Sequence, residues 1–121
     1  MESNFTNKAN EALQSAASAA TVAGNPAVEP AHLLVALLEP ADGIAAAVLA
    51  ALGQDPREVV AKARALAAGL PAASGSSVSQ PAFSQPAYRA IAAAQSLAQS
   101  RGDDFVSTEH LLVGIAQQTD S

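Results

Sequence analysis

The chain contains no cysteine and few aromatic residues. None of its 121 residues is Cys or Trp, and the aromatic share is 3 %. Without thiols the protein has no disulfide bridges, no thiolate zinc site and no cysteine nucleophile. So few aromatic residues also disfavour a β-sandwich and a surface on which nucleic-acid bases stack. These absences leave function classes that need neither thiol chemistry nor base stacking.

Positive charge is scarce and dispersed. Six basic residues stand against eleven acidic ones, which gives a net charge of -5. Nucleic-acid-binding proteins gather Lys and Arg to neutralise phosphates, so we expect no nucleic-acid partner. No apolar run approaches the roughly 20 residues that cross a bilayer, and the first residues do not resemble a signal peptide. We therefore predict a cytoplasmic protein with no membrane partner.

An internal repeat is the most informative feature that is present. Residues 11–43 align without a gap to residues 89–121, at a constant offset of 78. Eleven of the 33 pairs are identical, and the pattern Gly-x-x-x-Val-x-x-x-His-Leu-Leu-Val occurs in both copies. Alanine is abundant enough to give chance matches, but it does not produce this pattern twice. Because repeats define structural units, the chain is predicted to hold two copies of one helical unit.

Capping residues, glycines and prolines predict where the helices begin and end. The predicted helices cover residues 7–23, 30–39, 44–52, 56–68, 86–100 and 108–118. Thr6 is the expected N-cap of the first helix, and Gly24 fits the left-handed position after its end. The third helix is expected to carry the larger apolar residues Ile44, Val48, Leu49 and Leu52.

These elements predict one all-α domain that spans residues 1–121. Repeat one covers 5–71, a Ser- and Ala-rich linker covers 72–82, and an incomplete repeat two covers 83–121. The fold class is therefore all-α with two pseudo-symmetric helical repeats, the second one truncated. A truncated copy is expected to leave Leu111, Leu112 and Ile115 with less cover, unless the natural chain continues or another surface covers them.

Several segments resemble a known family. Phe5-Thr6-Asn7-Lys8, Pro30-Ala31-His32-Leu33-Leu34 and the stretch from Arg101 to Leu112 resemble the Clp N-terminal (repeat) domain, most closely that of the ClpB-type AAA+ disaggregase chaperones. The resemblance covers essentially the whole chain. It implies two pseudo-symmetric four-helix repeats without ATPase chemistry, and no Gly-x-x-x-x-Gly-Lys-Ser/Thr occurs here. The chain is thus predicted not to be an enzyme and to need no cofactor, because ATPase activity would reside in AAA+ modules.

The resemblance also implies partners and a site. It implies a non-catalytic protein-binding module that engages unfolded or aggregated polypeptide for the AAA+ ring of a hexameric, ClpB-like disaggregase. The alternative is an adaptor-docking domain of a Clp protease ATPase, or a stand-alone Clp accessory subunit. A purely structural spacer would bind no apolar polypeptide. The positions that match the family's substrate contacts are Thr6, Ile91, Leu97, Asp103 and Glu109.

Each of these residues also has a structural interpretation. Thr6 is a helix cap, and Ile91 and Leu97 lie on an apolar stripe of the kind that usually packs in a core. Asp103 follows a glycine in a predicted turn, and Glu109 suits the positive end of a helix. Catalysis by paired carboxylates would need acids with divergent pKa values across a cleft. We also expect no Ser-His-Asp set, because no serine stands in a nucleophile elbow.

Two histidines stand at equivalent positions of the repeat. His32 and His110 both fall in the first turn of a predicted helix, and neither has a second ligand four residues later. We therefore expect local hydrogen bonding and no metal site.

Overall fold

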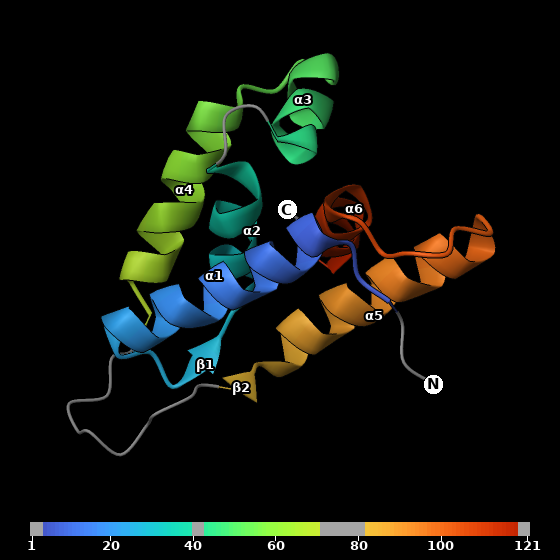
Figure 1. Cartoon of the computed structure of the whole chain (residues 1–121). Coiled ribbons are helices and arrows are strands. Elements are labelled where there is room, and N and C mark those ends of the chain that lie inside the picture. Colours follow the sequence, from blue (N-terminus) through green and yellow to red (C-terminus); the bar gives the residue numbers. More distant parts are fainter. Residues whose placement is uncertain (1–3, 40–42, 71–81, 119–121) are drawn as a thin grey trace.

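The computed structural model describes residues 4–39, 43–70 and 82–118. The elements in these residues are α1 (Asn7–Ala23), β1 (Ala27–Val28), α2 (Pro30–Leu38), α3 (Ile44–Ala51), α4 (Pro56–Ala68), β2 (Ala82–Phe83), α5 (Gln85–Ser100) and α6 (Thr108–Gln118). The two longest helices, α1 and α5, slope across the view in Figure 1, with β1 and β2 paired near their ends. The predicted all-α class is confirmed. None of the described helices is both long and apolar enough to cross a bilayer.

The helices begin where the sequence places caps. The backbone N–H of Ala9 donates to Thr6 Oγ1 at 3.1 Å, which confirms the predicted cap of α1. At the equivalent point of repeat two, the N–H of Ala87 donates to Ser84 Oγ at 3.2 Å. Gly24 follows α1 with φ 77°, in the left-handed region that favours glycine. Both repeats therefore begin with the same local device.

A reciprocal exchange of short extended segments joins the two repeats. In one place β1 pairs in parallel with β2, with Val28 opposite Phe83. In the other, Phe5 pairs in parallel with Val106. Val28 and Val106 are equivalent residues of the two repeats, and so are Phe5 and Phe83. The two pairings are therefore the same contact, made once by each repeat with the other. The sequence-based prediction lacked these strands, and Ala82, which we placed in the linker, belongs to β2. The rest of the predicted linker lies outside the described residues.

Alanine forms much of the helical core. The buried residues of α1 and α5 are the equivalent sets Ala9, Ala12, Ala16, Ala20 and Ala87, Ala90, Ala94, Ala98. Their spacing of three and four residues puts each set on one face of its helix. Between α5 and α6 the approach is so close that a Cβ added to Gly114 would stand 2.3 Å from the carbonyl oxygen of Ala90. The abundance of alanine thus reflects closely packed helices.

The core differs from the sequence-based expectation in two places. Leu111, Leu112 and Ile115 are all buried, because α3 and α2 of repeat one contact α6 in addition to α5. In α3 the larger residues Ile44 and Leu52 are exposed. The fully buried residues of this helix are Ala45 and Ala46, and Val48 and Leu49 are half-buried against the core. The inward face of α3 thus combines small and larger apolar residues, so the size of a residue alone does not predict whether it is buried.

Candidate functional site

The residues before α1 and the loop between α5 and α6 lie together. The N–H of Thr6 donates to the carbonyl of Val106 at 3.0 Å, and the N–H of Val106 donates to the carbonyl of Asn4 at 2.7 Å. Asp103 lies in the same loop, and Glu109 lies in the first turn of α6. The structure therefore brings three of the predicted site residues to one end of the molecule.

The two apolar candidates lie on α5 and are half-buried. Ile91 packs against the core, whereas Leu97 stands near the end of the helix, where its carbonyl accepts from the N–H of Arg101 at 3.1 Å. Six residues of helix separate the two by about 9 Å. Only Leu97 is thus close to the loop in sequence, and a ligand contact by either residue stays a prediction.

His110 is bonded through both ring nitrogens. Its Nδ1 accepts from the backbone N–H of Ser107 at 2.9 Å, and its Nε2 lies 2.9 Å from Asp103 Oδ2. A nitrogen that accepts from a backbone N–H carries no proton in the neutral ring, so the proton is assigned to Nε2, which donates to the carboxylate. The N–H of His110 reaches back to Ser107 Oγ at 3.5 Å. The arrangement is a capping box with histidine in the place of Glu or Gln.

His32 makes the same bonds in repeat one. Its Nδ1 accepts from the N–H of Glu29 at 2.8 Å, and its Nε2 lies 2.9 Å from Asn25 Oδ1. In both repeats the acceptor side chain precedes the histidine by seven residues. The local bonding expected of the two histidines is confirmed. The repeats differ in the acceptor: Asn25 is a buried amide, whereas the side chain of Asp103 is 46 % exposed.

Ser107, His110 and Asp103 come into contact, contrary to our expectation that no such set forms. Ser107 Oγ lies 3.0 Å from His110 Nδ1. In a serine hydrolase the histidine takes the hydroxyl proton on a free nitrogen lone pair. Here the single lone pair of Nδ1 already accepts the backbone N–H of Ser107. The nitrogen is not free to act as a base, so the array serves as a helix cap.

The α5–α6 loop combines exposed acidic residues with an exposed aromatic ring. Asp103 and Asp104 are exposed, and Glu109 lies 3.9 Å from Arg101, an exposed ion pair that contributes little to stability. Phe105 is 46 % exposed beside them. Sequence reasoning missed Phe105 as a candidate site residue. The signal was available, because the equivalent residue of repeat one is Ala27.

Burial gives His32 a pH-dependent role in stability. Burial lowers the pKa of His32, and the Glu29 carboxylate opposes this. In the unfolded chain the imidazole gains its proton near pH 6.5. Between that pH and the lower folded pKa, the unfolded state binds more protons, so stability falls as pH falls. We expect the free energy of unfolding to decrease from pH 7 to pH 5, by at most about 1.4 kcal/mol per pH unit from this group.

Urea unfolding of the wild type and of a His32→Gln variant at several pH values measures this contribution. Gln keeps an acceptor for the Glu29 N–H but does not titrate. We expect a shallower pH slope for the variant, because the other titrating groups are shared. Identical slopes would contradict the assignment to His32.

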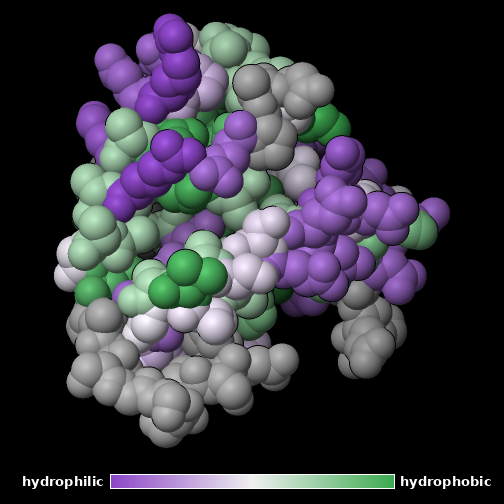
Figure 2. All heavy atoms as spheres, turned by 60° about the vertical axis from the view of Figure 1, so that its left-hand side comes forward, coloured by the Kyte–Doolittle hydropathy of each residue, from purple (hydrophilic) through white to green (hydrophobic). Residues whose placement is uncertain are grey.

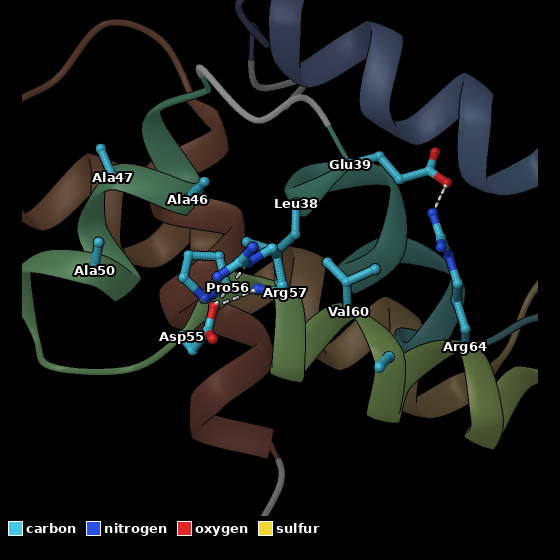
Figure 3. Close-up of a pocket in the computed structure, with 11 residues that line it drawn as sticks. Leu38, Glu39, Ala46, Ala47, Ala50, Asp55, Pro56, Arg57, Val60 and Arg64 are labelled. Atoms are coloured by element: carbon cyan, nitrogen blue, oxygen red, sulfur yellow. Dashed lines mark hydrogen bonds and ion pairs between the residues drawn. The ribbon is translucent and has the colours of Figure 1, made fainter.

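Two cavities lie in repeat one, away from the predicted site. The larger, of about 590 Å³, lies between α2, α3 and α4, with Leu38 and Val60 among its apolar lining. Figure 3 shows Arg64 reaching from α4 to Glu39 at its rim. A smaller cavity of about 230 Å³ lies between α1, α2 and α4. None of the five predicted residues lines either one. Figure 2 shows the side with α4 and the end of α1, where hydrophobic atoms form separate patches among hydrophilic ones.

Comparison with known proteins identifies a family and close relatives. The sequence matches the Clp repeat (R) N-terminal domain over residues 4–121. The chaperone protein ClpB of Corynebacterium glutamicum is 53 % identical over 114 residues, which cover 94 % of this chain and 13 % of the relative. ClpB of Mycobacterium tuberculosis H37Rv is 49 % identical over 113 residues, which cover 93 % and 13 %. The chain therefore spans about 13 % of the length of these relatives.

Solved structures share the fold at low sequence identity. The Hsp104 N-terminal domain from Candida albicans has a TM-score of 0.85 at 16 % identity, covering 95 % of this chain and 75 % of that one. A ClpV N-domain in complex with a VipB peptide has a TM-score of 0.77 at 22 % identity, covering 98 % and 72 %. At these identities the likeness concerns the fold alone.

Proposed function

This chain belongs to the Clp repeat N-terminal domain family, and from that premise we propose that it is a non-catalytic protein-binding module. It engages unfolded or aggregated polypeptide and passes it to the hexameric AAA+ ring of a ClpB-like, ATP-dependent disaggregase in the cytoplasm. The high identity to ClpB chaperones supports the disaggregase branch. The ClpV N-domain solved with a peptide supports peptide binding by this fold.

A difference between the two repeats carries the proposal. At equivalent positions, repeat two has Leu97, Asp103, Phe105 and Glu109 where repeat one has Ala19, Asn25, Ala27 and Ala31. Features that the fold needs, such as the capping histidine and the paired valine, recur in both copies. The larger apolar and the acidic residues of repeat two are therefore not required by the fold. Apolar groups ringed by polar ones are typical of a protein-binding surface.

The chemistry of this surface suits an extended, unfolded ligand. Half-buried Ile91 and Leu97 and exposed Phe105 offer apolar contact, and none of the three lines either cavity described above. Such contacts select for hydrophobicity and not for one sequence. Affinity is expected to be weak, because an unfolded ligand loses conformational entropy when it is ordered. Attachment of several copies to one ring would compensate by raising the local concentration.

The two repeats supply the variant that tests the proposal. The test is a fourfold variant in which repeat two receives the residues of repeat one at these positions. Its substitutions are Leu97→Ala, Asp103→Asn, Phe105→Ala and Glu109→Ala. We expect at least a tenfold loss of affinity for reduced, alkylated α-lactalbumin, a permanently unfolded protein. The fold is expected to survive, because none of the four side chains is fully buried. Backbone NMR titration measures both binding and folding.

Val22→Ser is the matched control. Val22 is 89 % exposed on repeat one, and serine is its counterpart in repeat two, at Ser100. This change removes exposed apolar surface away from the site, so affinity is expected to stay unchanged. Equal binding by the fourfold variant and the wild type would refute the site. Wild-type binding to a folded adaptor, with none to the unfolded protein, would favour the adaptor-docking alternative.

A further inference from the structure

We propose that His110 is a positioning residue, which holds the Asp103 carboxylate so that one oxygen is presented to N–H groups of a bound polypeptide. The proposal rests on the function proposed above. Asp103 Oδ2 lies 2.9 Å from His110 Nε2. Within the part of the chain that the structure describes, Oδ1 has no hydrogen-bond partner. One oxygen is thus anchored to a buried ring, and the other remains available at a half-exposed position.

The anchor is fixed because the ring cannot present its other nitrogen. Nδ1 accepts the backbone N–H of Ser107 at 2.9 Å. A flip of the ring would leave that N–H without its acceptor at the start of α6, which is costly for a group removed from water. The imidazole is also buried, so solvent does not compete for Nε2–H. His110 therefore donates to Asp103 in a single orientation.

Repeat one shows what the structural part of this device requires. His32 has the same two bonds, but its Nε2 faces the amide oxygen of Asn25, a buried residue. An amide is sufficient to close the cap there. The carboxylate at Asp103 adds charge and an accessible oxygen, which the cap does not need. It does so in the loop that also holds exposed Phe105 and leads to Glu109.

A fixed oxygen favours a directional donor. A backbone N–H forms a strong hydrogen bond only over a narrow range of angles, so pre-orienting its acceptor helps binding. A lysine ammonium is a compact charge with three rotatable donors and gains less from a fixed acceptor. Arg101 and Glu109 form an ion pair in which their charges cancel. Asp103 and Asp104 then leave the local net charge negative. The proposed contact is therefore between Asp103 and backbone N–H groups of an extended ligand.

Three variants separate positioning from charge. His110→Gln keeps an acceptor for the Ser107 N–H and an amide N–H for Asp103, so affinity for reduced, alkylated α-lactalbumin is expected within about threefold of wild type. His110→Leu removes both functions and is expected to weaken binding at least fivefold, as is Asp103→Asn. The double variant His110→Leu with Asp103→Asn should lose no more affinity than either single variant, because both changes remove the same contact with the ligand. His32→Gln, the same change in repeat one, is the control and should leave affinity unchanged.

The outcomes decide between failures. Full wild-type affinity for His110→Leu, or additive losses in the double variant, would overturn the positioning role while the proposed function stands. An absence of wild-type binding would instead overturn the proposed function. If leucine prevents folding, NMR of the wild type decides: the Nε2–H resonance of His110 should shift on ligand addition in the wild type and not in Asp103→Asn. An unmoved resonance in the bound wild type would refute the proposal.

Discussion

Replacing Gly114 with alanine is expected to lower the free energy of unfolding by about 2–3 kcal/mol. A Cβ at this position would lie 2.3 Å from the carbonyl oxygen and 3.3 Å from the carbonyl carbon of Ala90, and 3.0 Å from the backbone nitrogen of Ala94. These are backbone atoms of α5, so no side chain can rotate away and the helices must separate. Overpacking typically costs about 1–3 kcal/mol and occasionally more, and we expect about 3–4 kcal/mol here because backbone atoms oppose the added Cβ. Alanine regains about 1 kcal/mol of helix propensity, which limits the net loss.

Urea or thermal unfolding of matched variants tests this close approach. A loss of this size should lower the melting temperature by roughly 10 °C in a domain of this length. Gly69→Ala is the control, because the nearest atom to an added Cβ is 3.7 Å away and φ is -84°. Its stability is expected to stay within about 0.5 kcal/mol of wild type. Equal stability of the Gly114 and Gly69 variants would mean that α5 and α6 are farther apart than described.

Gly114 also shows a limit to predicting the fold from the sequence repeat. Ala36 stands at the equivalent position of α2, so the alignment alone treats Gly114 as a conservative difference. In the structure, the glycine marks an α5–α6 contact closer than alanine permits. Helix bounds were predictable because caps such as Thr6 act through residues three or four positions away. The contacts of α3 with α6 were not predictable, because they join residues that are far apart in the sequence.

The candidate site was predictable only in its outline. Resemblance pointed to Thr6, Asp103 and Glu109, and the structure places them near one another, although it does not test their role. The link between Asp103 and His110 needed the geometry of the loop, since the spacing of seven residues alone does not indicate a hydrogen bond. Phe105 was missed because a single aromatic residue in a loop has no periodicity. Comparison between the repeats, position by position, is what exposes it.

Asn25 and Asp103 show how burial separates two equivalent positions. Both accept from the Nε2 of a capping histidine at 2.9 Å. Asn25 is 3 % exposed, whereas the side chain of Asp103 is 46 % exposed. The carboxylate at 103 is therefore more open to solvation by water than one at 25 would be. Burial also lowers the pKa of His32, so the surroundings of this ring disfavour a positive charge. A carboxylate in place of Asn25 would therefore be placed at a position largely removed from water.

Asn25→Asp is accordingly expected to lower the free energy of unfolding by about 3 kcal/mol at pH 7, since burying a carboxylate is strongly destabilising. The deficit relative to wild type should shrink toward acid pH, because protonating the new carboxyl group removes the buried charge. Asp103→Asn, the reverse change, should cost less than about 1 kcal/mol, because repeat one accommodates an amide there. Urea unfolding of both variants at pH 5 and pH 7 measures the difference. Equal costs would mean that burial does not distinguish the two positions.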